Sequence, residues 1–393
     1  FGNGMLLSRK TRLIAAFDHR HIFIDPNPDA ERSFEERKRL FELPQSKWSD
    51  YDSKLLSAGG GIFLRSEKEI AISAEAQAAL GVGAATLSGQ ELVKAILKAP
   101  ADLLWNGGIG TYVKSADEDN NLVGDRTNDE VRVDARELRV KVVGEGGNLG
   151  FTQLARIEYS KIGGHINTDA VDNSGGVNLS DLEVNLKILL SAPVARGELK
   201  SEERNALLTS LATDVCQKVV RRNRSQSRAL SLGVRRSRKN LSAVRSLIHT
   251  LAKEKIVDPK GEHLPSDETL SHRIQLKAGL TRPELAVLVG CTKMSLFKTV
   301  IDSSVPDDLF LAPFLFGYFP RPVIERFSAD IPQHPLHREI IATEVSNMLV
   351  ERFGASFVYR SAEELGLGRT TVINAALAAD AIVGAHSLTE KLE

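Results

Sequence analysis

Cysteine is scarce in this sequence, and long apolar runs are absent. The two cysteines, Cys216 and Cys291, stand far apart and outside any CxxC or Cys/His spacing. Isolated thiols fit a reducing compartment and exclude a disulfide framework or a structural zinc site. No run of about 18 apolar residues is available to cross a membrane, and the first residues lack the pattern of a signal peptide. We therefore expect a cytoplasmic protein without a membrane-spanning segment or a metal site.

An excess of charge of either sign is also missing. Lys and Arg total 51 and Asp and Glu total 51, so the whole chain has no field that would attract nucleic acid or a membrane. One segment is locally basic, with no acidic residue between its members, which are Arg221, Arg222, Arg224, Arg228, Arg235, Arg236, Arg238 and Lys239. This run contains no aromatic residue for base stacking. We favour a solvated face or a subunit contact over the alternative, a phosphate or nucleic-acid site.

Motifs of nucleophilic catalysis are missing as well. The chain has no GxSxG, and its nine histidines do not pair with a cysteine or serine at a telling spacing. His19, His21 and His165 fall near the loops of the predicted sheet, and we interpret each as a surface or supporting residue. A covalent acyl or thiol mechanism is therefore not expected.

The stretch from Lys141 to Leu190 has the pattern strand, glycine loop, helix, strand, glycine loop, helix. Its first loop is Gly144-Glu145-Gly146-Gly147-Asn148, and a helix over Phe151–Lys161 follows, with Leu154, Ile157 and Ile162 on one face. A strand over His165–Val171 leads into the second loop, Asn173–Ser180, after which Ser180 with Glu183 predicts a capping box. Glycine turns after successive strands are typical of a parallel α/β sheet whose backbone approaches a ligand.

A third loop has the same character. Asp102–Trp105 predicts a short strand that leads into Asn106–Thr111. Because the carboxyl ends of parallel strands share one edge of a sheet, we expect this loop to lie beside Glu145–Leu149 and Asn173–Ser180. Each loop combines glycine with asparagine, whose amide both donates and accepts hydrogen bonds, as recognition of a carboxamide or a sugar requires. The alternative is three ordinary turns.

The first residues resemble the second half of a dinucleotide-binding βαβ unit. Gly2 and Gly4 form a turn, Met5–Ser8 predicts the start of a helix, and Arg12–Phe17 predicts a strand that ends at Asp18. An acid at that position accepts hydrogen bonds from the adenosine ribose; the alternative is an aspartate that caps a turn. The chain starts at Phe1 inside the turn, so we expect a piece of a longer polypeptide that lacks the first strand.

The second half of the sequence is helical. We expect an α/β, Rossmann-like nucleotide-binding domain over residues 1–192 and an all-α domain over residues 193–393. An inserted helix is expected over Ser33–Phe41, with Ser33 as its N-cap. Helices of the second domain are predicted at 198–222, 228–253, 283–301, 337–353 and 371–383.

At these loops the chain resembles the large, multidomain bacterial NAD-specific glutamate dehydrogenases. The EGxN-type loop of glutamate dehydrogenases corresponds to Glu145–Asn148, and their N-x-GG-V-x-x-S turn corresponds to Asn173–Ser180. Longer strings match as well: FGNGMLLS, AAFDHRHIFIDPNPD, DLLWNGGIGTYVK, VVGEGGNLG and DNSGGVNLSDLEVN in the first half, and LPSDETL, GLTRPELAVL, YFP and HREIIATEVSN in the second.

The resemblance implies NAD-dependent oxidative deamination of L-glutamate to 2-oxoglutarate and ammonium by a homo-oligomer. It implies that Asp18 holds the adenosine ribose and that Ser180 binds a substrate carboxylate. The other cofactor contacts that it implies are Gly2, Asn3 and Gly4 at the pyrophosphate, Asn106, Gly107 and Gly108 beside the cofactor, and Asn148 and Asn173 at the nicotinamide ribose and carboxamide.

No catalytic residue is expected in this chain, because the family's lysine and aspartate lie in a substrate domain that would precede Phe1. The chain alone is therefore expected to be inactive and to bind NAD weakly. Two alternatives remain at this point: an NAD-dependent dehydrogenase of another amino acid, and a non-catalytic regulatory or assembly module.

Overall fold

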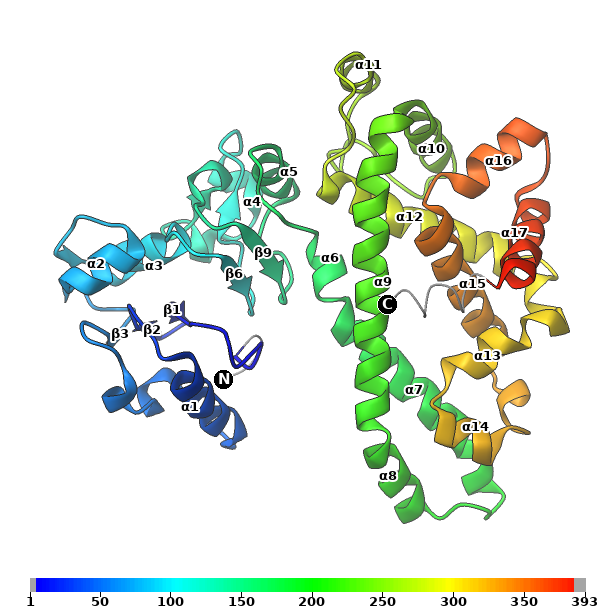
Figure 1. Cartoon of the computed structure of the whole chain (residues 1–393), viewed down its shortest axis with the longest axis horizontal. Coiled ribbons are helices and arrows are strands. Elements are labelled where there is room, and N and C mark those ends of the chain that lie inside the picture. Colours follow the sequence, from blue (N-terminus) through cyan, green and yellow to red (C-terminus); the bar gives the residue numbers. More distant parts are fainter. Residues whose placement is uncertain (1–4, 385–393) are drawn as a thin grey trace. The chain divides into compact units, whose positions relative to one another are not determined.

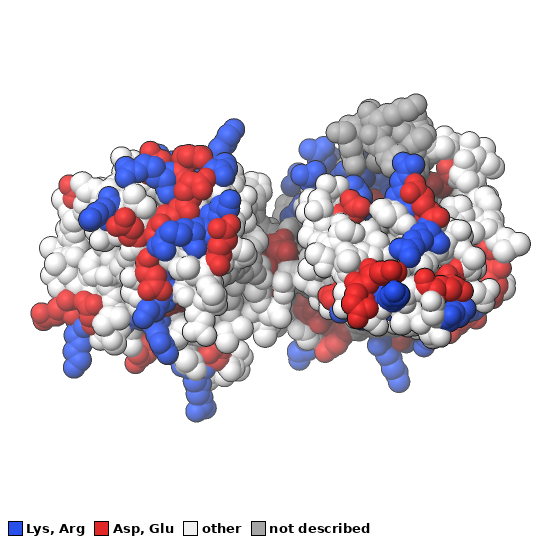
Figure 2. Space-filling model, turned by 90° about the horizontal axis from the view of Figure 1, so that it is seen from below, with Lys and Arg blue, Asp and Glu red and all other residues white. Residues whose placement is uncertain are grey.

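A computed structural model describes residues 5–384 (Figure 1). The chain forms two compact units, Phe1–Asn173 and Ser174–Glu393, which we call the α/β unit and the helical unit. Their division precedes the expected boundary at 192/193, because Ser174–Ala195 forms one continuous helix, α7. On the face shown in Figure 2, basic and acidic side chains are interspersed over both units, as the balanced composition predicts.

The α/β unit begins with an antiparallel sheet and not with the expected parallel one. Its strands are β1 (Ala15–Phe17), β2 (His21–Ile24) and β3 (Gly61–Leu64), paired in that order. β1 and β2 are antiparallel, with Phe17 opposite Ile22, because the chain reverses in a tight turn over Asp18–Arg20. Residues 5–8 contain a turn and a bend but no helix, so the predicted helix there is wrong.

A parallel pair of strands follows later in the chain. β6 (Leu103–Asn106) pairs with β9 (Val142–Glu145), and the two arrows lie side by side in Figure 1. Gly144 lies opposite Trp105, and a Cβ on Gly144 would lie 2.6 Å from the indole ring. The predicted strand at His165–Val171 is reduced to one parallel bridge between Val142 and His165, because residues 169–172 form the short helix α6 (Asp169–Asp172).

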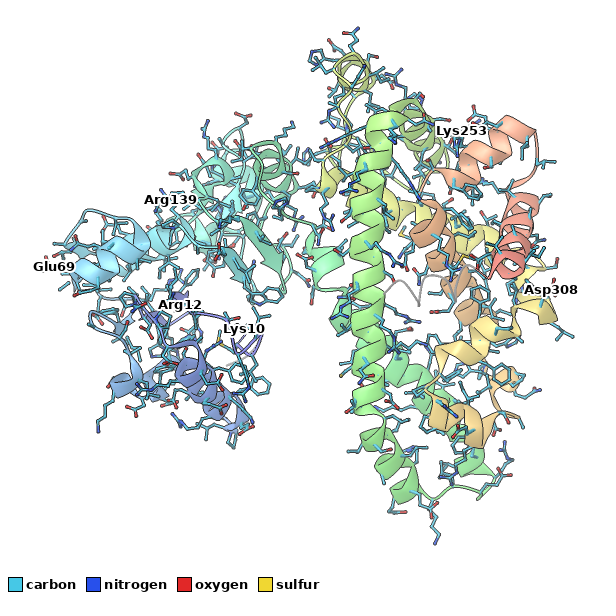
Figure 3. All side chains as sticks on the ribbon, in the orientation of Figure 1. Lys10, Arg12, Glu69, Arg139, Lys253 and Asp308 are labelled. Carbon is cyan, nitrogen blue, oxygen red and sulfur yellow. The ribbon has the colours of Figure 1, made fainter. Side chains whose placement is uncertain are left out.

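The remaining elements of the α/β unit are α1 (Ala30–Glu42), β4 (Ile70–Ala71), α2 (Ala74–Leu80), β5 (Thr86–Leu87), α3 (Gly89–Leu97), β7 (Val113–Lys114), α4 (Asn120–Val123), β8 (Val133–Asp134) and α5 (Gln153–Lys161). α1 is capped by Asp29 and not by Ser33, which is buried inside the helix. Arg139, labelled in Figure 3, donates to the Leu80 carbonyl at 2.8 Å and so closes the end of α2.

The core of the α/β unit lies between α3, α5 and the short strands. Leu92, Val93, Val113 and Ala155 have no exposed surface there. Complete burial of a leucine or valine side chain stabilises the fold by about 1.5–3 kcal/mol. The predicted apolar face of α5 is partly wrong: Ile157 is buried, but Leu154 is only half-buried, Ile162 is 56% exposed, and the charged Arg156 is buried.

The helical unit contains no strand among its described residues, 174–384. Its helices after α7 are α8 (Ser201–Ser210), α9 (Ala212–Lys239), α10 (Leu241–Lys253), α11 (Asp267–Gln275), α12 (Arg282–Ile301), α13 (Ala312–Tyr318), α14 (Arg321–Phe327), α15 (His337–Phe353), α16 (Phe357–Leu365) and α17 (Arg369–Val383). The bounds predicted for α15 are confirmed. Across residues 5–384, no helix has the length and hydropathy of a membrane span.

The basic run lies on α9, which is a single helix through residues where two were predicted. Gly233 does not end it, and the helix continues to Lys239, where Asn240 caps the next helix. Arg222 is half-buried, contacts Glu344 and lies over the Tyr318 ring at 5.3 Å. The other seven basic residues of the run are exposed. The run therefore combines one structural arginine with a solvated face.

Candidate functional site

Two loops that follow the parallel strands are bonded to each other. We call residues 106–111 the first asparagine loop and residues 145–150 the second asparagine loop. The Gly147 amide donates to the Asn106 carbonyl at 2.9 Å, and the Thr111 hydroxyl donates to the Leu149 carbonyl at 2.7 Å. Leu149 has φ = +58°, a left-handed backbone that is uncommon for leucine. The sequence correctly placed both loops at strand ends, and the structure joins them.

The third predicted segment, Asn173–Ser180, contacts the second asparagine loop through its first residue. The Asn173 side-chain amide donates to Asn148 Oδ1 at 2.6 Å. Asp169 and Asp172 of α6 accept from the backbone amides of Leu149 and Glu145, at 2.8 and 3.0 Å. The structure thus brings Asn148 and Asn173 together, at the carboxyl end of β9.

Glycine is required where the loops meet. A Cβ on Gly147 would lie 2.3 Å from the Gly108 carbonyl oxygen, and a Cβ on Gly150 would lie 1.5 Å from Asn106 Nδ2. Gly107 and Gly108 are themselves exposed. The backbones of the two loops therefore pack closely at Gly147 and Gly108, and the exposed backbone of Gly107 and Gly108 has no side chain that would keep a ligand away.

The three asparagines are in different states. Asn106 Oδ1 accepts from the Gly108 amide at 3.2 Å and so shapes its own turn, while its Nδ2 is buried without a hydrogen-bond partner in the described part of the chain. Asn148 is exposed, and its Oδ1 is occupied by Asn173. Its own amide N–H groups make no hydrogen bond to residues 5–384. These groups can donate to a ligand carbonyl or hydroxyl.

A buried ion pair lies directly beneath the second asparagine loop. Glu145 has no exposed side-chain surface, and Arg156 of α5 donates to both of its carboxylate oxygens, with Nε at 2.7 Å and Nη2 at 2.9 Å. Arg156 Nη2 also lies 3.2 Å from Asp169 Oδ1. Burial raises the pKa of Glu145, and the hydrogen bonds from Arg156 oppose that shift. One guanidinium thus connects the first residue of the loop to α6.

Sequence reasoning missed Arg156, Asp169 and Asp172. A buried acid such as Glu145 needs a partner, and that need was the available signal. The identity of the partner could not be predicted from the sequence, because Arg156 lies on a helix whose buried face was predicted to consist of Leu154, Ile157 and Ile162. Among residues 5–384 there is no group of three or more His, Cys, Asp or Glu side chains that could hold a metal ion.

Asp18 occupies the turn between β1 and β2. Its Oδ1 accepts from the backbone amides of Arg20 at 2.7 Å and His21 at 2.6 Å. This geometry is that of an aspartate capping a turn, the second of the two interpretations, and it leaves Oδ2 without a hydrogen bond in the described part of the chain. The preceding Phe17 packs edge-on against Tyr112, with ring centroids 5.3 Å apart, beside the first asparagine loop. Gly2, Asn3 and Gly4 lie outside the described residues.

Ser180 is placed differently from its prediction. It is an exposed residue inside α7 and not an N-cap, and Glu183 contacts Lys187 at 2.6 Å instead of closing a capping box. The predicted glycine turn over Asn173–Ser180 is therefore wrong beyond Asn173. The helix starts at Ser174 and packs against α9: a Cβ on Gly175 would lie 3.7 Å from Val219, an ordinary contact distance.

A unit with glycine–asparagine loops at the ends of parallel strands, followed by a helical unit, has the features of a ligand-binding enzyme domain with a helical extension. Residues 1–233 match the family described as bacterial NAD-glutamate dehydrogenase, catalytic domain, and residues 277–393 match glutamate dehydrogenase, C-terminal. The chain belongs to the bacterial NAD-glutamate dehydrogenase family. The catalytic-domain match continues through α7 into α9, so it includes Ser180 as well as the loops.

Three curated relatives have the name NAD-specific glutamate dehydrogenase. The chain is 51% identical to the one from Pseudomonas aeruginosa over 375 residues, which are 95% of this chain and 23% of that protein. It is 46% identical to the one from Mycobacterium tuberculosis over 398 residues, 100% of this chain and 24% of that protein. It is 47% identical to the one from Halomonas elongata over 375 residues, which are 95% of this chain and 23% of that protein. The chain spans about a quarter of the length of these relatives.

Proposed function

We propose that this chain is part of an NAD-dependent glutamate dehydrogenase, which oxidatively deaminates L-glutamate to 2-oxoglutarate and ammonium. In this proposal residues 1–173 are a Rossmann-like unit that holds NAD. The joined asparagine loops at the carboxyl ends of β6 and β9 are the observation that carries it, because dinucleotides bind at that edge of an α/β sheet. The names of the three relatives supply the substrate.

The groups present in the two loops fit the nicotinamide half of NAD. A carboxamide and a ribose need both donors and acceptors, and Asn148 has donors that make no hydrogen bond within residues 5–384. The exposed Gly107 and Gly108 leave room for a ring to approach the backbone. Asp18 Oδ2 is an acceptor suited to the adenosine ribose, while Oδ1 is held by its own turn.

The work of these residues in the reaction is positioning. NAD supplies the hydride acceptor, and this chain's side chains would orient the nicotinamide toward the α-carbon of glutamate. Correct orientation of two reactants contributes several kcal/mol to catalysis without any proton transfer. Ser180, with its hydroxyl on the exposed surface of α7, is proposed to contact a substrate carboxylate. No general acid or base is assigned to this chain, so we expect the 393 residues by themselves to have no turnover.

Assembly and location form part of the same proposal. We expect a cytoplasmic homo-oligomer. The helical unit exposes 89% of Leu309 and 52% of Phe310, apolar surface that a subunit contact would bury.

The test is steady-state kinetics of the full-length protein with glutamate and NAD, followed by NADH absorbance. Asn148→Ala is expected to raise the KM for NAD by about tenfold, because it removes hydrogen bonds to the cofactor. Asn205→Ala, at an exposed asparagine of α8, is the matched control and should leave kinetics unchanged. Absence of glutamate-dependent NAD reduction would refute the activity, and wild-type NAD affinity in Asn148→Ala would refute the site.

A further inference from the structure

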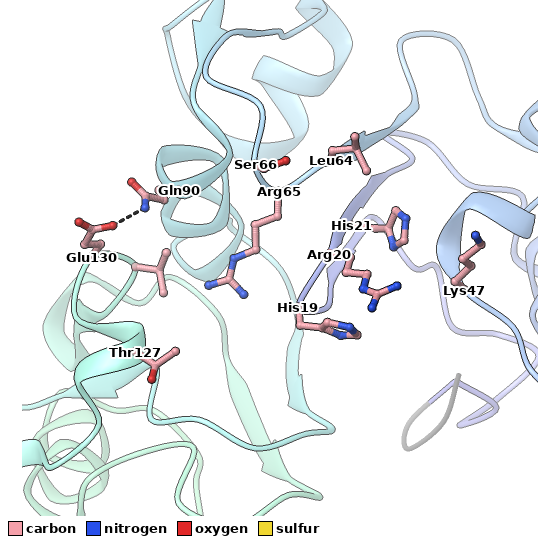
Figure 4. Close-up of a pocket in the computed structure, with 11 residues that line it drawn as sticks. His19, Arg20, His21, Lys47, Leu64, Arg65, Ser66, Gln90, Thr127 and Glu130 are labelled. Atoms are coloured by element: carbon pink, nitrogen blue, oxygen red, sulfur yellow. Dashed lines mark hydrogen bonds between the residues drawn. The ribbon is translucent and has the colours of Figure 1, made fainter.

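The α/β unit contains a cavity of about 540 Å³ beside the turn of Asp18 (Figure 4). Its walls come from the turn and start of β2, the end of β3, the start of α3 and the segment after α4. We call it the basic cavity and define it by its lining residues, His19, Arg20, His21, Lys47, Leu64, Arg65, Ser66, Gln90, Thr127, Glu130 and Val131.

The lining has a surplus of positive charge. Arg20, Lys47 and Arg65 are cations, and within residues 5–384 none of them forms an ion pair with a carboxylate. Glu130 is the one acidic residue of the lining, and it accepts a hydrogen bond from Gln90, drawn as the dashed line in Figure 4. Elsewhere in the same unit Lys98 and Lys141 each contact a carboxylate, at 2.7 and 2.8 Å. Three cations without an ion pair and only one carboxylate give the lining a net positive charge, which favours an anionic ligand.

The two arginines are held in place by the backbone. The Arg65 amide donates to the Arg20 carbonyl at 2.7 Å, which extends the β2–β3 ladder by one step. The Arg20 amide donates to Asp18 Oδ1 at 2.7 Å, and Arg65 Nη1 donates to the Asp18 carbonyl at 3.3 Å. The backbones of Arg20, in the turn, and of Arg65, after β3, are therefore fixed relative to each other, which lowers the entropy lost when the two side chains close on a ligand.

A buried histidine adds a second, independent sign of a ligand. His21 lines the cavity and is only 7% exposed, and its Nδ1 has no hydrogen-bond partner among residues 5–384. The nearest carboxylate oxygen, Asp18 Oδ1, is 3.6 Å away, beyond hydrogen-bond distance. A buried polar atom without a partner is costly, and a ligand oxygen in the cavity would satisfy it.

We propose that the basic cavity binds the phosphate group of a phosphorylated sugar that is separate from NAD. Arginine guanidinium groups, which can donate two parallel hydrogen bonds, and lysine ammonium groups are the usual protein partners of a phosphate. Ser66, Gln90 and Thr127 offer hydrogen bonds to sugar hydroxyls, and no aromatic side chain lines the cavity to stack on a base. The volume is in the range of small-molecule sites. This inference goes beyond the proposed function and does not require it.

The experiment is calorimetric titration of the full-length protein with ribose 5-phosphate and with inorganic pyrophosphate, at saturating NAD. The double substitution Arg20→Gln with Arg65→Gln is expected to weaken both ligands at least tenfold, because each guanidinium makes a charge-assisted contact. The control, Arg32→Gln with Lys68→Gln, removes the same charge at exposed positions that do not line the cavity, and should change affinity less than twofold.

Three outcomes overturn the proposal: equal weakening in the control pair, unchanged affinity in the cavity pair, or loss of wild-type phosphate binding when NAD is saturating. The last would mean that the cofactor's own phosphates occupy the cavity. NAD binding is titrated separately. If the protein binds the phosphate ligands but not NAD, the proposed function fails while the proposal for the basic cavity stands. Thermal unfolding of both double variants checks that each one folds.

Discussion

Among the described residues, the α/β unit and the helical unit each contain a buried glutamate that accepts two hydrogen bonds from one arginine. In the α/β unit Arg156 donates hydrogen bonds from Nε and Nη2 to the two carboxylate oxygens of Glu145, at 2.7 and 2.9 Å. In the helical unit Arg273 of α11 also donates two hydrogen bonds to Glu284 of α12, but through its terminal nitrogens Nη1 and Nη2, with both distances 2.8 Å. The side chains of Glu145 and Glu284 are 0% and 2% exposed. The chemistry is the same, so the difference lies in what each pair holds.

The pair in the helical unit fastens one helix to another. Glu284 also accepts from the Thr281 amide at 2.7 Å, as the third residue of a capping box at the start of α12. The pair in the α/β unit fastens a loop, because Glu145 begins the second asparagine loop and Arg156 also contacts Asp169, which accepts from Leu149. One pair therefore supports the fold, and the other supports both the fold and the proposed nicotinamide site.

The largest expected effect comes from Arg156→Ala in the full-length protein. Removal of the guanidinium leaves Glu145 buried without its partner and Asp169 without its ion pair, which is expected to cost about 3–5 kcal/mol of unfolding free energy. Urea unfolding of this variant beside Arg273→Ala measures the cost in each unit. Similar losses would support the equivalence of the two pairs, and a loss below about 1 kcal/mol for Arg156→Ala would contradict the ion pair.

The milder variant, Arg156→Lys, separates positioning from stability. Lysine keeps the charge but loses the two-pronged contact, so the loop is expected to shift while the protein stays folded. We expect about tenfold weaker NAD binding and unchanged binding of ADP-ribose, which lacks nicotinamide. Arg273→Lys is the matched control and should change neither. Equal weakening of NAD and ADP-ribose would mean that Arg156 has only a structural role.

The comparison of the two units also shows what the sequence could predict. Helix α15 has the predicted bounds, because its apolar periodicity and its flanking residues are local signals. The loops after β6 and β9 were also predicted, since a glycine after an apolar run is a local pattern. The antiparallel pairing of β1 was not, because strand direction depends on a turn that closes through Asp18 and not on composition.

Ser180 shows why a local pattern can mislead. Ser180 with Glu183 satisfies the capping-box pattern, yet α7 continues six residues further toward its N-terminus, to Ser174. Packing against α9 stabilises those extra turns, and the Ser174 hydroxyl donates to Asn223 at 3.0 Å. Tertiary contacts therefore moved the start of the helix. Arg156 was missed for the same physical reason, since its partners lie on other elements.

Glycine substitutions sharpen the comparison at a smaller scale. Gly147→Ala would place a methyl group 2.3 Å from the Gly108 carbonyl, so we expect about 1–3 kcal/mol of destabilisation and weaker NAD binding. Gly290→Ala, inside α12 with no atom within 4 Å of the added Cβ, is expected to stabilise by about 0.5–1 kcal/mol. Thermal unfolding and NAD titration measure both. An unchanged NAD affinity in Gly147→Ala would show that the two loops tolerate separation.

The smallest expected effect is a pH dependence confined to the helical unit. His334 is 1% exposed; its Nδ1 accepts from the Leu336 amide at 3.0 Å, and its Nε2 lies 3.1 Å from the Asn185 carbonyl. Burial lowers the pKa of His334, so the unfolded chain takes up a proton at higher pH than the folded one. Stability should therefore be complete above the unfolded pKa, about 6.5, and should fall as the pH drops below it.

A charged His334 would also lose its acceptor at Nδ1, which requires the Leu336 amide to find another partner. Unfolding free energies measured between pH 5 and pH 8 should therefore slope downward toward acid in the wild type. His334→Gln removes the titrating group and should flatten that slope, even if the whole curve is lower. A variant curve parallel to the wild type would assign the pH dependence to other groups.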